Sequence, residues 1–136
     1  MTNITALAEL TDLQALDLRN TSVRDLAPLA ALTRLEQLDL DMTLVTDLTP
    51  LAGLKNLQCL WLAFTPIKDL VPLAGLAKLE WLDIRGTSVT DPAPLGRLKS
   101  LRMLFLPAAI SDERFGTLSR ALPTCKIGRE LAQLLH

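Results

Sequence analysis

The sequence predicts an α/β solenoid: a right-handed superhelix with a parallel sheet on its concave side and short 3-10 or helical turns on its convex side. Leucine supplies 33 of the 136 residues. Four columns of like residues recur at intervals of 22, namely Thr21, Thr43, Thr65 and Thr87; Val23, Val45, Ile67 and Val89; Asp25, Asp47, Asp69 and Asp91; and Pro28, Pro50, Pro72 and Pro94. One such unit cannot bury its own leucines, whereas stacked units bury them against their neighbours.

Each unit carries the signals of one strand and one tight helical turn. In the first unit Leu16 and Leu18 flank a polar residue, which is the period of two that a half-buried strand shows. The chain then turns near Thr21. Asp25 can accept N–H groups at the start of a turn, and Pro28 suits a first turn because no amide donor is missed there. We therefore expect a strand and an Asp-capped turn in every unit.

We predict that residues 1–136 form a single domain. Its repeats begin at Leu10, Leu32, Leu54, Leu76 and, in degenerate form, Leu98, and a partial repeat covers residues 3–9. Because the pattern begins partway through a unit, the strand at residues 16–18 is expected to be an exposed edge. Either upstream sequence was removed, or a partner or sister chain covers this edge.

A C-terminal cap is predicted for about residues 107–136. One residue drops out near Pro107, so that Ile110 and Asp112 take the Val and Asp positions one step early. Residues 111–113 resemble a helix start, and Pro123 ends that helix. The apolar face of the helix consists of Phe115, Leu118 and Leu122.

A last strand is predicted at residues 124–127, 21 residues after Leu104 and Leu106. This register places Cys125 and Ile127 inward. Residues 129–136 are expected to add a short helical turn.

These repeats resemble the leucine-rich repeats of the 22-residue, internalin-like bacterial class, and the resemblance covers about residues 3–127. The family usually has Asn where this sequence has Thr21 and its equivalents. In the family, that Asn forms a hydrogen-bond ladder between neighbouring loops. The resemblance implies a variant ladder here, because a Thr hydroxyl still donates one hydrogen bond.

Composition argues against several classes of protein. With 14 basic and 15 acidic residues the net charge is −1, which does not favour nucleic-acid binding. No apolar run is long enough to span a membrane. The first residues lack the features of a signal peptide, so we expect a cytoplasmic protein, or one exported without a cleavable signal.

Reactive groups are also scarce, so we predict a protein that is not an enzyme and has no cofactor and no metal. The only histidine, His136, is the last residue, and no phosphate-binding, dinucleotide-binding or zinc-protease motif occurs. Cys59 and Cys125 lie three strands apart in the predicted stack, too far for a disulfide. A calcium site would need more oxygen ligands than a flat sheet supplies.

Aromatic residues gather at positions that alternation places on the concave face. Four of the five aromatics occupy these positions: Trp61, Phe64, Trp81 and Phe105. We expect these rings to lie bare and to be dispensable for stability, because leucine fills the core. An exposed apolar patch of this kind is typical of a binding surface.

The N-terminal half of the same face is acidic. Asp17 and Asp39 occupy one column on adjacent strands, with Asp41 nearby, and Arg19, beside Asp41, is placed to compensate part of the repulsion between these like charges. Residues 1–96 carry 7 basic and 12 acidic groups, whereas residues 97–136 carry 7 basic and 3 acidic groups. The basic excess is scattered over the cap and lacks the aromatic platform of an RNA-binding surface.

We predict that the concave face binds another protein, with aromatic anchors, adaptable methionines and aspartates that orient a basic partner. The residues assigned to this site are Trp61, Phe64, Trp81, Phe105, Met42, Met103, Asp17, Asp39, Asp41, Asp83 and Arg85.

Three alternatives remain open at this point. The chain is a self-associating scaffold that forms a homodimer through the concave face or the N-terminal edge. It is, by analogy with the family, the substrate-recruiting arm of a larger bacterial effector enzyme. Or the tail residues Leu131, Leu134 and Leu135 cover the aromatic rings.

Overall fold

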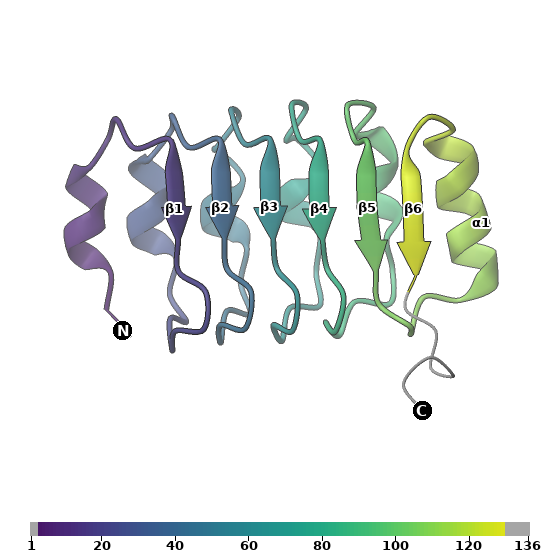
Figure 1. The fold of residues 1–136 in the computed structure, drawn as a ribbon, viewed down its shortest axis with the longest axis horizontal. Coiled ribbons are helices and arrows are strands. Elements are labelled where there is room, and N and C mark those ends of the chain that lie inside the picture. The colour runs from purple at the N-terminus through teal and green to yellow at the C-terminus, as the bar shows by residue number, and fades with distance from the viewer. Residues whose placement is uncertain (1–2, 130–136) are drawn as a thin grey trace.

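A computed structural model describes residues 3–129. Its six strands form one parallel sheet in chain order (Figure 1). The strands are β1 (Ala15–Asp17), β2 (Gln37–Asp39), β3 (Cys59–Trp61), β4 (Trp81–Asp83), β5 (Met103–Leu106) and β6 (Lys126–Arg129). Short helices lie behind the sheet, and the predicted solenoid is confirmed.

The sequence period sets the strand register. From β1 to β5, each strand residue pairs with the residue 22 positions later, so that Leu38 lies between Leu16 and Leu60. Leucine therefore stacks on leucine along the whole core, and Leu38, Leu60, Leu82 and Leu104 are fully buried. The side chains between them point to the opposite face of the sheet.

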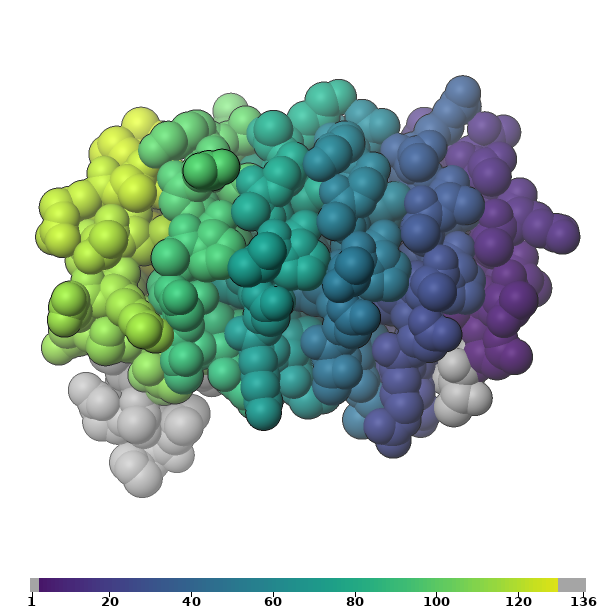
Figure 2. All heavy atoms as spheres, turned by 180° about the vertical axis from the view of Figure 1, so that it is seen from behind, coloured from purple at the N-terminus to yellow at the C-terminus, as the bar shows by residue number. Residues whose placement is uncertain are grey.

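The convex side consists of 3-10 helices and one α-helix. These are η1 (Thr5–Glu9), η2 (Ala27–Ala31), η3 (Thr49–Leu51), η4 (Val71–Leu73), η5 (Ala93–Arg97) and α1 (Asp112–Ala121). The predicted Asp caps are present: Asp69 Oδ1, for example, accepts the Val71 N–H at 2.9 Å, and a proline occupies the first turn of η2 to η5. Seen from this side, the repeats form closely packed parallel bands (Figure 2).

The repeated threonines act within their own repeats. Each hydroxyl donates to the carbonyl three residues earlier, as Thr43 Oγ1 does to Leu40 O at 2.8 Å. The expected threonine ladder between repeats is therefore wrong, because the hydroxyl's single proton is already used. Backbone N–H groups link the turns instead, and Met42 N–H donates to Ala63 O at 2.9 Å.

At the C-terminus, helix α1 begins as predicted, with Ser111 Oγ accepting the Arg114 N–H at 3.2 Å. The last strand begins two residues later than predicted, because Leu104 pairs with Ile127 and not with Cys125. The α-helix explains this shift: it rises about 1.5 Å per residue, against about 2.0 Å in a 3-10 helix, and so uses more residues for the same height. Cys125 and Ile127 still pack against the core, because a shift of two residues leaves the same side chains on the core side of the chain.

Arg129, which was expected to begin a helical turn, is the last residue of β6. Its guanidinium bonds Asp112 Oδ1 at 2.7 Å and lies 4.9 Å from the centre of the Phe115 ring. The rest of the predicted tail turn, and the folding back of the tail leucines, concern residues outside 3–129.

At the N-terminal end, β1 pairs only with β2 within residues 3–129, so its other edge is unpaired by any described strand. Helix η1 lies beside η2 (Figure 1). Leu16 is only half-buried, although its equivalents in the following strands are fully buried. The expectation of an exposed edge strand holds for the described residues.

Candidate protein-binding face

We call the outward side of β1 to β5, together with the turn after each strand, the sheet face. Strand register places Asp17, Asp39, Trp61, Asp83 and Phe105 side by side in one row across it. A second row, two residues earlier on each strand, consists of Ala15, Gln37, Cys59, Trp81 and Met103. Seven of the eleven predicted site residues therefore lie in these two rows.

The aromatic rings on the strands of this face are partly covered. Trp61, Trp81 and Phe105 are half-buried, as is Met103. Trp81 and Phe105 pack with ring centroids 5.6 Å apart and planes inclined at 51°. The expectation that the rings lie bare is therefore wrong for these three rings, whereas Phe64 is 59% exposed, and truncating the three removes packing as well as exposed surface.

Trp81 also carries an unsatisfied donor. Its indole Nε1–H is buried and has no hydrogen-bond acceptor among residues 3–129. A buried donor without a partner lowers stability.

Asp83 was predicted to orient a basic partner, but it is buried, with an exposed fraction of 3%. Its carboxylate binds the neighbouring Arg85, with Oδ2 2.7 Å from the guanidinium NH2 group. The same guanidinium lies 5.0 Å from the centre of the Phe105 ring. Asp83 therefore holds Arg85 over Phe105 and is not accessible to a partner.

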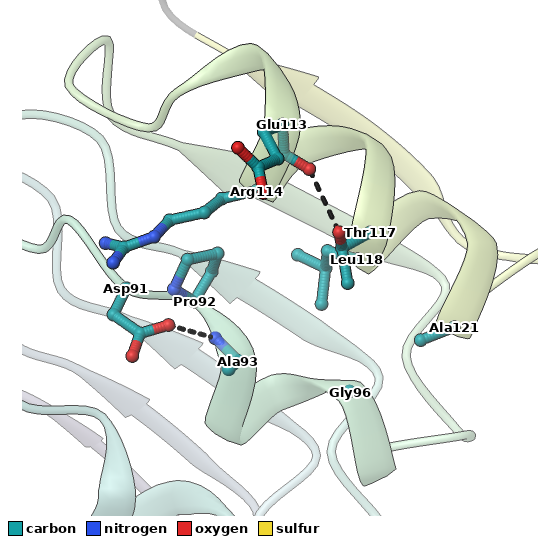
Figure 3. A pocket seen from close by; sticks show the side chains of 9 residues that line it. All are labelled: Asp91, Pro92, Ala93, Gly96, Glu113, Arg114, Thr117, Leu118 and Ala121. Atoms are coloured by element: carbon teal, nitrogen blue, oxygen red, sulfur yellow. Dashed lines mark hydrogen bonds between the residues drawn. The ribbon is translucent and has the colours of Figure 1, made fainter.

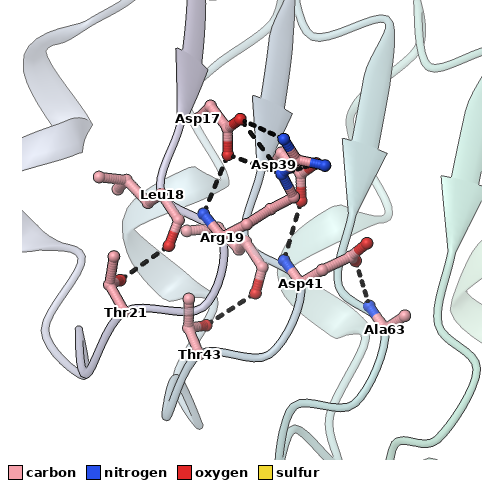
Figure 4. A network of polar contacts seen from close by, with 9 residues as sticks. Asp17, Leu18, Arg19, Thr21, Asp39, Asp41, Thr43 and Ala63 are labelled. Carbon is pink, nitrogen blue, oxygen red and sulfur yellow. Dashed lines mark hydrogen bonds and ion pairs between the residues drawn. The ribbon is translucent and has the colours of Figure 1, made fainter.

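The acidic half of the sheet face lies over β1 and β2 (Figure 4). Arg19 binds Asp17, with NH2 3.0 Å from Oδ2, and its Nε lies 3.4 Å from Asp39 Oδ2. Asp41 Oδ1 accepts the Ala63 N–H of the next repeat at 2.8 Å. Arg19 thus offsets part of the repulsion between the two strand aspartates, as expected.

These carboxyl groups differ in acidity. Hydrogen bonds from the backbone and side chain of Arg19 lower the pKa of Asp17. Burial raises the pKa of both Asp39 and Asp41, and the neighbouring carboxylates add to the effect. Asp39 and Asp41 are thus held in a setting that disfavours their charged forms.

The turn after each strand presents a further column of side chains. Asn20, Met42, Phe64 and Gly86 all have positive φ, between 56° and 70°. Met42 and Phe64 are the large apolar members, with exposed fractions of 51% and 59%. Both were predicted to lie on this face, but their left-handed backbone was not predicted.

A shallow hollow lies on the acidic half of the face, bounded by Trp61 on one side. Its lining consists of Ala15, Leu16, Asp17, Arg19, Gln37, Asp39 and Trp61. The hollow thus combines carboxylates with one aromatic wall.

A second depression lies on the convex side between η5 and α1 (Figure 3). Pro92, Ala93 and Leu118 form part of its apolar lining. Two of the polar groups at its rim are engaged: Asp91 caps Ala93, and Arg114 donates to Thr90 O at 2.7 Å. This depression brings together no set of groups suited to catalysis.

The described residues contain no group of three or more side chains that could hold a metal ion. Cys59 and Cys125 are free thiols, and burial raises the pKa of both, which makes them weak nucleophiles. Within residues 3–129, no helix has the length and apolar character needed to cross a bilayer.

Known proteins share the repeats and the fold of this chain. The family model for leucine-rich repeats (two copies) matches residues 11–53 and 33–77. No curated protein matches the sequence.

Two internalin structures from Listeria monocytogenes are similar to this chain. Internalin C2 is 34% identical with a TM-score of 0.87, over 96% of this chain and 57% of that one. The internalin InlF is 27% identical with a TM-score of 0.72, over 99% of this chain and 48% of that one. The chain thus spans about half the length of these two proteins. A leucine-rich repeat protein from Leptospira interrogans, 23% identical with a TM-score of 0.74 over 92% of this chain and 39% of that one, shares the fold.

Proposed function

Because this chain is a leucine-rich repeat protein with internalin-like repeats, we propose that its sheet face binds another protein and that it does so without catalysis. Leucine-rich repeat proteins typically are protein-interaction modules, and stacked repeats create extended binding surfaces. The assignment of the sheet face rests on the residues below.

The observation that carries the proposal is the position of Met42 and Phe64. Both are exposed apolar side chains at positive φ, where Asn or Gly is favoured and other residues are strained by about 1 kcal/mol or more. Asn20 and Gly86 fill the equivalent positions in neighbouring repeats. Neither exposure nor strain helps folding, so a binding role accounts for both residues.

The half-buried aromatic rings extend this apolar surface onto the strands. Trp81 and Phe105 pack together, and Asp83 fixes Arg85 over Phe105, so these side chains are ordered before a partner binds. Ordering in advance reduces the entropy that binding costs. Tryptophan and arginine are also the residues most often found as binding hot spots.

The test is affinity capture with the wild-type chain and a Met42→Asn/Phe64→Asn variant, read by mass spectrometry. Asparagine suits a left-handed turn, so the variant should fold at least as well as the wild type. Val71→Asn is the matched control, because it removes an apolar side chain that is 63% exposed on the convex side.

We expect a partner captured by the wild type and by Val71→Asn to be lost with the double variant. Purified partner should then bind the wild type and not the double variant. Equal binding to all three proteins would contradict the proposal. Sedimentation of the chain alone separates a foreign partner from self-association.

A further inference from the structure

The sheet face is divided into an acidic and an aromatic half, and the division indicates what kind of segment it accepts. The acidic half consists of Asp17, Asp39 and Asp41 with Arg19, which gives one positive and three negative groups at neutral pH and a net charge of −2. The aromatic half begins at Trp61, the register partner of Asp39 on the next strand. The two halves therefore meet between β2 and β3.

The carboxylates at this junction are only partly neutralised. Arg19 is committed mainly to Asp17, which it meets through Nε at 3.1 Å from both carboxylate oxygens as well as through NH2. Its approach to Asp39 is longer, at 3.4 Å. Asp41 makes no ion pair within residues 3–129, and both Asp39 and Asp41 are half-buried.

An added cation would be favoured at this position on two counts. It would offset the repulsion between carboxylates on adjacent strands. It would also lie near the indole of Trp61, the side chain that binds cations best through its ring face. Arg19 already shows that a guanidinium fits between two carboxylates on adjacent strands, those of Asp17 and Asp39.

On the basis of the proposed function, we propose that the partner is a protein segment that places a lysine or arginine at the junction of Asp39, Asp41 and Trp61 and a large apolar side chain against Trp81 and Phe105. Two to three strand spacings of about 4.8 Å separate the two positions. An extended segment that crosses the strands covers this distance in about three to four residues, at about 3.3 Å per residue. The segment is therefore basic at one end and apolar at the other.

Selection from a random peptide library displayed on phage tests this proposal without knowledge of the natural partner. The immobilised wild-type chain is the bait. We expect enriched peptides to carry Lys or Arg three to four residues from a large apolar residue. One enriched peptide is then synthesised, together with a version in which Gln replaces its basic residue.

Affinity is measured for the wild type, Asp39→Asn/Asp41→Asn and the control Asp12→Asn/Glu113→Gln. The asparagines keep the oxygens that accept the Asp41 and Ala63 N–H groups, so the fold should be retained. The control removes the same number of charges from exposed positions outside the sheet face. We expect about tenfold weaker binding to the first variant, a similar loss for the Gln peptide, and a change within about twofold for the control.

The outcomes separate this inference from the proposed function. Peptides that need Trp61 but contain no basic residue, and that bind Asp39→Asn/Asp41→Asn as well as the wild type, would overturn the inference and leave the proposed function intact. Peptides that bind Trp61→Ala and Met42→Asn/Phe64→Asn undiminished would count against both. Failure to enrich any peptide of the expected pattern would also overturn the inference.

Discussion

Phe64 and Gly86 form a matched pair at equivalent positions of neighbouring turns. The Phe64 ring lies against Gly86, and a Cβ on that glycine would overlap the ring. Gly86 also has a φ of 70°, which a residue with a side chain adopts only under strain. The glycine thus gives Phe64 its place on the surface.

This pairing allows a double-mutant test. We expect Gly86→Ala to lower the free energy of unfolding by about 1–3 kcal/mol, because it adds both backbone strain and the clash with Phe64. Phe64→Asn should leave stability unchanged or raise it. In the Phe64→Asn/Gly86→Ala double variant the clash is absent, so chemical denaturation should show that part of the loss has been recovered. Strictly additive effects would contradict the steric pairing.

Asp39 and Asp41 give a prediction on pH. Burial raises the pKa of both in the folded protein, so the folded state favours their protonated forms. Their contribution to stability is greatest below the unfolded pKa of about 3.9 and is lost as the pH rises through the raised values. We therefore expect Asp39→Asn/Asp41→Asn to melt at a higher temperature than the wild type near neutral pH, with the difference narrowing towards about pH 3.

The variant also loses the ion pair between Arg19 and Asp39. This costs little stability, because the pair is long and its arginine is exposed. Thermal melts of the two proteins at several pH values measure the effect. A lower melting temperature for the variant at neutral pH would show that the two carboxylates stabilise the folded chain.

Single residues also show how far the sequence could be interpreted. Alternation correctly placed Asp83 on the sheet side but could not predict its burial, which depends on how Arg85 and its neighbours cover it. The left-handed turns were predictable in principle, since Asn20 and Gly86 share a column with Met42 and Phe64. Asn and Gly are the residues that most readily adopt positive φ.

Among the elements, the 3-10 helices η2 to η5 each begin at an aspartate cap. Asp69 Oδ1 accepts the Val71 N–H at the start of η4. We expect Asp69→Ala to lower the free energy of unfolding by about 1 kcal/mol and Asp69→Asn to cost clearly less, because asparagine also caps. Urea titration of both variants measures the difference. Equal losses would mean that the cap's hydrogen bond contributes little.

The strands and helices also separate what was predictable from what was not. The 22-residue period predicted β1 to β5 and their in-phase register, because identical columns must stack. It could not predict the register of β6, where an α-helix replaces a 3-10 helix and changes the number of residues between strands. The Ser111 cap indicated the helix start, but no repeat fixed where the following strand would begin.

At the scale of the whole molecule, stability should vary along the stack. Each repeat contacts only its neighbours, and strand β1 has a described strand beside it on one side only. We expect Leu60→Ala, at a fully buried central position, to cost about 3–5 kcal/mol, and Leu16→Ala, at the half-buried edge, to cost much less. Chemical denaturation compares the two. Similar losses would show that the edge is as well packed as the centre.

Because the register is in phase, each repeat adds one strand and the sheet lengthens in equal steps. A second copy of residues 54–75 inserted after the first would add one strand and lengthen the sheet by about 4.8 Å. Neighbouring repeats would still contact one another in the same way. Asp39 and Phe105 would then lie one strand spacing further apart. A bound segment that touches both would have to be longer by one or two residues. The number of repeats therefore sets the length of the segment that this surface can bind.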